Sequence, residues 1–205
     1  MTLKSDSLEK VASEVLGCPL CKLSRTRNNA VPGEGQVSAK LMFIGEAPGK
    51  NEDLKGRPFV GAAGRILDEA MKKAGLQRSE VFITNVVKCR PPGNRVPEEE
   101  ERLACRPYLQ RQILLLSPKI ICILGSTAYA SILGGKSITA SRGKIIMQEG
   151  QRYFLTVHPA AAIYNRRLRD IFENDILKLS EEFKKIGKGR YGNSLLRYMK
   201  EVDSE

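Results

Sequence analysis

Glu46, Asn85 and His158 each lie at the end of an apolar, strand-like run, where a side chain could bind or activate a small polar ligand. His158 is the only histidine of the chain. In open α/β sheets, ligands bind in the crevice beyond the carboxyl ends of the strands. We therefore expect a carboxylate, a carboxamide and an imidazole to meet at one edge of a sheet. The alternatives are an ordinary turn after the first run and a histidine without a chemical role.

Four cysteines could converge on a metal centre. Cys18 and Cys21 form a C-x-x-C pair, whereas Cys89 and Cys105 follow much later in the chain. Thiolates suit zinc or an iron–sulfur cluster, and one close pair with two distant cysteines leaves both choices open. Four unrelated thiols are the third choice. Cys122 lies within an Ile-Ile-Cys-Ile-Leu run, so we expect it to be a small buried apolar side chain.

The charge balance favours a polyanionic partner. The 205-residue chain holds 34 lysines and arginines against 23 acidic residues, a formal net charge of +11. Such a charge attracts nucleic acid, although net charge alone specifies neither a groove nor a substrate. No apolar run approaches the length that spans a membrane, and the first residues lack the apolar region of a signal peptide. We therefore expect a cytoplasmic protein that binds nucleic acid and no membrane.

Apolar runs alternate with helical patterns along the chain, which predicts an α/β fold with a parallel sheet and helices on both faces. The expected strands cover 41–45, 81–87, 119–124 and 153–157. Residues 142–148 could pair with the last strand as a hairpin. The expected helices cover 7–16, 62–74, 97 onward, 126–133 and 170–186. The four glutamates at 98–101 favour a helix start over a metal site, because carboxylates stabilise a first turn. We expect one domain over 1–186 and a basic C-terminal extension over 187–205.

Four motifs, taken with the cysteines, resemble those of the family 4 uracil-DNA glycosylases. They are GEAPG at 45–49, GRPFVG at 56–61, TNVVKCRPPGN at 84–94 and HPAA at 158–161. The resemblance implies a three-layer sandwich around a central four-stranded parallel β-sheet. It also implies a [4Fe-4S] cluster on Cys18, Cys21, Cys89 and Cys105, which selects iron–sulfur over zinc by analogy.

The resemblance further implies a DNA repair enzyme that flips uracil out of single- and double-stranded DNA and hydrolyses its N-glycosidic bond. No lysine lies in a recognisable nucleophile motif, so we expect a monofunctional enzyme that leaves an abasic site. Phe59 would stack on the uracil ring, and Asn85 would pair with its N3–H and O4. His158 would hydrogen-bond O2 as the bond breaks, and Glu52 would crowd the 5-position and so exclude thymine.

Water activation and DNA binding are less defined by these motifs. Better-known uracil glycosylases carry an aspartate where this chain has Ala47, so Glu46 or a backbone carbonyl would orient the water. Arg166, Arg167 and Arg169 could hold the DNA phosphates, or they could form a solvated helix start.

The loop at 160–164 could wedge into the base stack. We expect a monomer associated with the nucleoid, for which a replication sliding clamp is a candidate partner. Two other functions stay open. A non-catalytic protein that binds uracil or single-stranded DNA through the same pocket, with a structural metal centre, would release no free uracil. A small structural metal protein with basic surfaces would bind DNA without regard to uracil.

Overall fold

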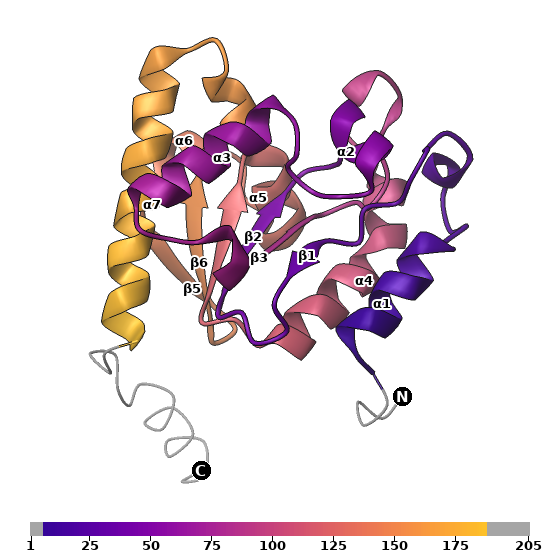
Figure 1. Ribbon diagram of the computed structural model, residues 1–205, viewed down its shortest axis with the longest axis horizontal. Helices are drawn as coiled ribbons and strands as arrows, with labels where there is room; N and C mark the ends of the chain where they lie inside the picture. Colours follow the sequence, from indigo (N-terminus) through magenta and orange to yellow (C-terminus); the bar gives the residue numbers. More distant parts are fainter. Residues whose placement is uncertain (1–5, 188–205) are drawn as a thin grey trace, which may run out of the picture.

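A six-stranded sheet with the strand order β1-β3-β2-β4-β6-β5 runs through the middle of the computed structural model, which describes residues 6–187 (Figure 1). The strands are β1 (Glu34–Gly35), β2 (Leu41–Gly45), β3 (Phe82–Asn85), β4 (Ile120–Leu124), β5 (Ile145–Gln148) and β6 (Gln151–Thr156). The α-helices are α1 (Leu8–Leu16), α2 (Lys50–Lys55), α3 (Ala62–Lys73), α4 (Glu99–Leu116), α5 (Ser126–Leu133), α6 (Ile138–Ser141) and α7 (Arg166–Gly187). Short 3₁₀ helices are η2 (Lys22–Arg25), η3 (Arg78–Glu80), η4 (Pro92–Asn94) and η5 (Pro159–Ala162). Within residues 6–187, every helix is too short or too polar to cross a lipid bilayer.

The four central strands are parallel, as the sequence predicts. β2 pairs with β3 and β4, and β4 pairs with β6. β1 and β5 lie antiparallel at the two edges, and β5 forms the expected hairpin with β6. The α/β sandwich with a four-stranded parallel centre is therefore confirmed, with one antiparallel strand added at each edge. This topology brings the carboxyl ends of β2, β3, β4 and β6 to the same side of the sheet.

Side chains of the central strands alternate between two apolar cores, one on each face of the sheet. Met42 and Ile44 pack in the core that includes α1, α4 and α5, whereas Leu41 and Phe43 pack in the core that includes α3 and α7. The helices thus form a layer on each side of the sheet (Figure 1). Cys122 of β4 is fully buried in the α3/α7 core, which confirms its expected apolar role.

The glutamate run begins a helix, as expected, although slightly later than predicted. α4 starts at Glu99 rather than at Pro97, with Glu98 as its N-cap. The Glu101 carboxylate accepts the Glu98 backbone N–H at 2.8 Å, which closes a capping box. Arg95 donates to both oxygens of the same carboxylate, so Glu101 is buried as half of an ion pair.

Two other helices depart from the expectation. α7 begins at Arg166, four residues before the expected start, because Asn165 Oδ1 accepts the Leu168 N–H and caps the helix. α2 forms where the sequence indicated only a turn. The Glu52 carboxylate accepts the Gly49 N–H at 3.1 Å and caps this helix, which places Glu52 on a short helix that starts just after the GEAPG motif.

Candidate active site

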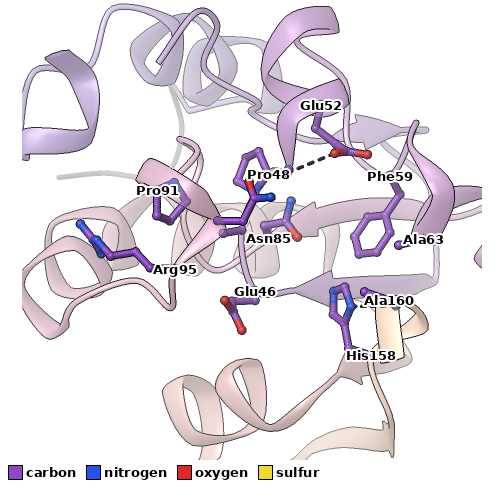
Figure 2. Close-up of a pocket in the computed structure, with 13 residues that line it drawn as sticks. Glu46, Pro48, Glu52, Phe59, Ala63, Asn85, Pro91, Arg95, His158 and Ala160 are labelled. Atoms are coloured by element: carbon purple, nitrogen blue, oxygen red, sulfur yellow. Dashed lines mark hydrogen bonds between the residues drawn. The ribbon is translucent and has the colours of Figure 1, made fainter. Parts of the chain in front are cut away.

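A cavity of about 380 Å³ opens at the carboxyl edge of the parallel strands (Figure 2). It is lined by Glu46, Ala47, Pro48, Gly49, Glu52, Phe59, Ala63, Asn85, Pro91, Asn94, Arg95, His158 and Ala160. A cavity of this size lies in the range that holds small ligands. The structure thus brings together every residue that the sequence analysis assigns to a substrate pocket.

Parallel pairing explains why residues far apart in the chain meet here. Gly45 at the end of β2 is the register partner of Asn85 at the end of β3. His158 follows β6 on the other side of β4. Gly125 follows β4 with a φ of +92°, and a Cβ there would lie 2.9 Å from the Cβ of His158. The missing side chain at Gly125 leaves room for His158 beside the end of β4.

Phe59 forms one wall of the cavity. Its ring centroid lies 5.7 Å from that of His158, with 31° between the two ring planes. A Cβ on Gly45 would lie 2.6 Å from Phe59 Cζ, so the ring packs directly on the backbone at the β2 exit. The side chain is buried in the α3/α7 core and also borders the cavity (Figure 2). Phe59 is therefore both a core residue and a flat surface for a planar ligand.

Asn85 carries a buried acceptor without a partner. Among the side chains that the structure describes, its Oδ1 is the one buried nitrogen or oxygen that makes no hydrogen bond. An unpaired buried polar atom costs about 1–3 kcal/mol, so its presence in a folded protein points to a missing ligand or water. The buried Lys88 donates to the Asn85 backbone oxygen at 2.8 Å and holds the strand exit in place. Asn85 therefore lines the cavity beside the Phe59 ring and carries an acceptor that no described protein group satisfies.

His158 is a neutral hydrogen-bond donor. Its Nδ1 accepts the backbone N–H of Ala160 at 3.1 Å, so the proton of the neutral ring lies on Nε2. Burial lowers the pKa of His158 to about 4, and the charge of Glu52 opposes this shift only in part. At neutral pH the imidazole therefore carries no charge and can donate from Nε2 to a ligand acceptor.

The two glutamates of the cavity differ in their contacts. The Glu52 carboxylate accepts the backbone N–H groups of Val60 at 2.8 Å and Gly61 at 2.7 Å, in addition to its capping bond. The Glu46 carboxylate lies apart from Glu52 (Figure 2) and has no hydrogen bond or ion pair with a residue in the described part of the chain. Ala47 lies next to Glu46 and brings no acid or base. Glu46 is therefore free to act on a ligand or water, whereas Glu52 is committed to the backbone.

The three arginines after the histidine motif are of two kinds. Arg166 and Arg167 are exposed at the start of α7 and form no ion pair within residues 6–187. Arg169 is partly buried and donates to Glu69 of α3 and, at 3.2 Å, to Glu173 of α7. Arg166 and Arg167 can thus bind an anion without breaking a contact, whereas Arg169 already joins two helices.

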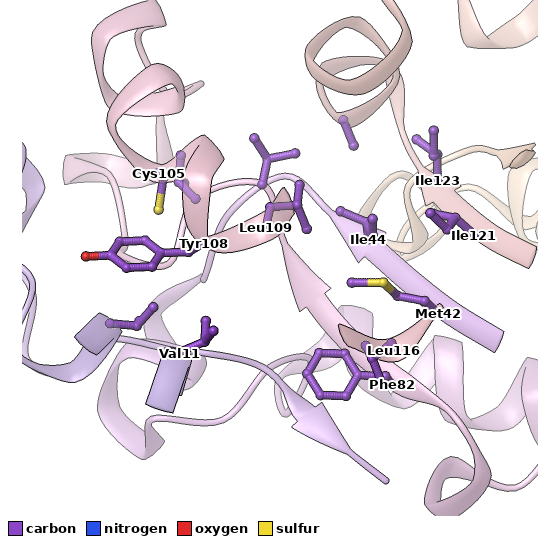
Figure 3. Packing of buried hydrophobic residues seen from close by; sticks show 14 of the residues in the cluster. Val11, Met42, Ile44, Phe82, Cys105, Tyr108, Leu109, Leu116, Ile121 and Ile123 are labelled. Carbon is purple, nitrogen blue, oxygen red and sulfur yellow. The ribbon is translucent and has the colours of Figure 1, made fainter. Parts of the chain in front are cut away.

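Four cysteines surround one small pocket on the α1/α4 side of the sheet. Cys18 and Cys21 follow α1, Cys89 follows β3, and Cys105 lies on α4. Figure 3 shows Cys105 with Tyr108 on the side of α4 that faces α1. Three chain segments that are distant in sequence therefore bring their thiols together, as the metal-centre prediction requires.

Hydrogen-bond donors point at these sulfur atoms. Arg27 Nη1 donates to Cys89 Sγ at 3.0 Å, and the Lys88 backbone N–H donates to Cys105 Sγ at 3.2 Å. Burial raises the pKa of Cys105 to about 11 and also raises that of Cys89. A coordinated metal deprotonates such thiols, and N–H groups directed at sulfur stabilise the resulting thiolates. The thiols and their surroundings therefore fit a bound metal group.

The loop after Cys89 joins the cysteine pocket to the cavity, a connection that the sequence pattern did not predict. Cys89 lines the cysteine pocket, while Pro91 and Arg95 line the cavity. A signal was present in the sequence, because one motif at 84–94 holds both Asn85 and Cys89.

Comparisons with known proteins agree with this geometry. A family model described as the uracil DNA glycosylase superfamily matches residues 32–185. The type-4 uracil-DNA glycosylase of Sulfurisphaera tokodaii is 55% identical over 186 residues, which cover 86% of this chain and 84% of that protein. The type-4 uracil-DNA glycosylase of Saccharolobus solfataricus is 50% identical over 186 residues, which cover 86% of each chain. That of Archaeoglobus fulgidus is 43% identical over 185 residues, which cover 86% of this chain and 93% of that protein.

Proposed function

Since this chain belongs to the uracil-DNA glycosylase superfamily and to its type-4 branch, we propose that the cavity binds uracil flipped out of DNA and that the enzyme hydrolyses the N-glycosidic bond of this base. The observation that carries the proposal is the unpaired Asn85 Oδ1, which shares the cavity with the Phe59 ring and the neutral His158. Uracil is a flat ring that presents one N–H between two carbonyl oxygens, and these three side chains match that pattern.

Asn85 would distinguish uracil from cytosine. Its Oδ1 would accept the uracil N3–H while its Nδ2 donates to O4, whereas cytosine presents an acceptor and a donor in the reverse order. An amide that rotated freely would accept both bases. The close packing of Oδ1 on the Gly45 backbone and the hold of Lys88 on the Asn85 backbone oxygen restrict that rotation.

His158 would stabilise the departing base. Negative charge develops on uracil as the C1′–N1 bond breaks, and a donor aimed at O2 lowers the energy of that charge. The neutral ring keeps its proton on Nε2 and needs no positive charge for this role. His158→Ala should therefore slow uracil release while DNA binding is largely retained.

Glu46 is the best placed group to orient the attacking water. Ala47 brings no general base, and both oxygens of Glu52 already accept backbone N–H groups. A sugar cation formed by a dissociative step needs a positioned water more than a strong base. Glu46→Gln tests this role, because a glutamine still orients water but cannot accept its proton.

Glu52 would exclude thymine. Its carboxylate is fixed at the cavity wall by the N–H groups of Val60 and Gly61, so a 5-methyl group would meet a side chain that cannot easily move. Rejection has to come from such a clash, because the contacts of one methyl group are worth only about 1–3 kcal/mol.

DNA would lie over the mouth of the cavity and the start of α7. Arg166 and Arg167 would bind phosphates there, and Arg169 would join them once its ion pairs open. Tyr164 lies in the 160–164 loop that precedes α7, and 99% of its surface is exposed. It is therefore the side chain of this loop best suited to fill the place of the flipped base. No lysine nucleophile is needed in this scheme, and an intact abasic site is the product.

Cys18, Cys21, Cys89 and Cys105 would hold a [4Fe-4S] cluster. A single zinc ion needs its thiolates within about 2.3 Å of one point, whereas a cluster binds each thiolate to a different iron. The cluster would supply cross-links that join the end of α1, the exit of β3 and α4.

The location, oligomeric state and domain bounds of the enzyme are also part of this proposal. We place the enzyme in the cytoplasm, associated with the nucleoid, as a monomer that could meet a sliding clamp. The glycosylase domain would cover residues 1–186. The basic extension at 187–205 lies outside the described residues, apart from Gly187 at the end of α7.

A non-catalytic uracil or single-strand DNA binder is the second candidate, because Ala47 lines the cavity in place of a base. Release of free uracil from a labelled oligonucleotide decides between the two. The assay should use single-stranded, U:G and U:A substrates, with His158→Ala in parallel. Release by the wild type and a rate about a hundredfold lower in the variant would support the enzyme. Tight binding without release would support the alternative.

A further inference from the structure

The backbone that carries Phe59 is held from two sides. Glu52 accepts the N–H groups of Val60 and Gly61, which follow Phe59. On the other side, the guanidinium of Arg78 donates to the carbonyl oxygen of Pro58 at 2.7 Å and to that of Phe59 at 3.4 Å. The Glu52 carboxylate thus binds the two backbone N–H groups that follow Phe59. The Arg78 guanidinium binds the carbonyl oxygen of Phe59 and that of the residue before it.

Arg78 is itself fixed by two carboxylates. Its Nε and Nη2 donate to Glu34 Oε1 of β1 at 2.9 Å and 2.7 Å, and its Nη1 donates to Asp68 Oδ1 of α3 at 2.8 Å. The planar guanidinium therefore has a bonding partner on each edge, which a flexible ammonium could not reproduce. Arg57 also pairs with Glu34 at 2.7 Å. The side chain of Arg78 lies outside the cavity and touches none of its space.

Phe59 needs such support because its backbone is strained. Its φ is +50°, in the left-handed region that residues other than glycine rarely adopt. α3 presses against the same peptide, since a Cβ on Gly64 would lie 1.9 Å from the Phe59 carbonyl oxygen. If the Pro58 and Phe59 carbonyls were released, the backbone could relax toward negative φ, and the ring would turn away from Gly45 and His158.

We propose that Arg78 is a positioning residue for base recognition, which acts by holding the Phe59 backbone in the conformation that places the ring against the flipped base. This inference rests on the proposed function of the cavity. It assigns a role in recognition to a residue outside the cavity, in the 3₁₀ helix that precedes β3.

The test is a double-mutant cycle on single-turnover uracil release from single-stranded DNA. Arg78→Met should raise the half-saturating enzyme concentration about tenfold, because stacking on one aromatic ring contributes that order of affinity. The maximal rate should change less, since stacking forms both before and during bond cleavage. Phe59→Ala should have a similar effect. In the Phe59→Ala background, Arg78→Met should then cost less than about twofold, because its effect passes through the missing ring.

Arg111→Met is the matched control. Arg111 is as exposed as Arg78, at 27% against 25%, and it also pairs with two carboxylates, Asp6 and Glu14. It lies on α4, away from the cavity, so its loss should leave the half-saturating concentration unchanged. Arg78→Lys should fall between Arg78→Met and the wild type, and it replaces Arg78→Met if that variant does not fold.

The outcomes separate this inference from the function itself. Absence of uracil release by the wild type would contradict the proposed function. Normal release by the wild type with an unchanged half-saturating concentration in Arg78→Met and Arg78→Lys would overturn the inference. An undiminished effect of Arg78→Met in the Phe59→Ala background would also overturn it, because the arginine would then act through general stability rather than through Phe59.

Discussion

Gly45 and Asn85 are register partners at the ends of β2 and β3, and a Cβ on Gly45 would lie 2.5 Å from Asn85 Oδ1. The same Cβ would lie 2.6 Å from Cζ of Phe59. The carboxamide and the ring proposed to recognise uracil therefore both pack on one bare stretch of backbone. In the proposed binding mode, recognition of the base would depend on the absence of a side chain at Gly45 as much as on the groups that surround it.

Gly45→Ala should consequently impair the enzyme without unfolding it. The added methyl group has to displace Asn85 or Phe59, and overpacking of this kind costs about 1–3 kcal/mol. Where the displaced site bears that cost in the transition state, the single-turnover rate should fall by roughly five- to 150-fold. Gly17→Ala is the control, because a Cβ there meets no atom within 4 Å and the backbone is not left-handed. Equal rates for the two alanine variants would show that the packing at the β2 exit does not shape the site.

Asn85→Asp should abolish most uracil excision. The aspartate has no N–H for O4, and its charge would repel that oxygen, so we expect a loss of about a hundredfold or more in single-turnover rate. Asn174→Asp adds the same charge on the exposed face of α7 and should leave the rate unchanged. Normal excision by Asn85→Asp would remove Asn85 from base recognition.

The pH dependence of uracil release follows from the neutral state of His158. Burial lowers its pKa to about 4, so the single-turnover rate should stay constant down to about pH 5 and fall to half near pH 4. A histidine with an ordinary pKa would instead lose activity near pH 6.5. The profile should be repeated in Glu46→Gln, since carboxylates also titrate in acid. A midpoint near pH 4 that persists in this variant does not come from Glu46 and agrees with the titration of His158.

Stability should respond to the same shift. Because the folded state holds His158 neutral while the unfolded chain takes up a proton below pH 6.5, this residue contributes stability above pH 6.5 that is progressively lost between pH 6.5 and 4. His158→Gln should reduce this part of the pH dependence of the melting temperature. An identical slope in wild type and variant over that window would contradict the assignment.

Cys105→Ala should remove the cluster and weaken the fold. One ligand of four would be lost, so we expect less bound iron, a weaker visible absorbance and a lower melting temperature. Cys122→Ala is the control, because Cys122 is buried in the opposite core and should leave the iron content unchanged. About four iron atoms per chain in the wild type would agree with the proposal. Stoichiometric zinc without iron would contradict it.

The sequence by itself determined the central strands, most of the helices and the candidate residues. Apolar runs such as 41–45 and 119–124 become buried strands because both faces of the sheet are covered. Helix starts follow from local hydrogen bonds, as where the Ser7 side chain caps the first turn of α1. The sequence also indicated that Asn85 and His158 lie at the ends of strands. Because parallel strands end on one side of a sheet, it further indicated that these side chains lie at the same edge. β1, by contrast, spans only Glu34–Gly35 and is too short to leave a pattern.

Only the tertiary structure decided how the candidate residues work. Glu52 binds the backbone around Phe59, Arg169 pairs with Glu69 and Glu173, and Arg78 reaches from η3 to the carbonyl of Phe59. Apart from the i,i+4 pair of Arg169 with Glu173 within α7, none of these contacts follows a helical or strand period, because each joins groups on separate elements. Local propensity determines where the chain turns and pairs, whereas the protonation of His158 and the unpaired oxygen of Asn85 arise from burial, which exists only once the layers have packed.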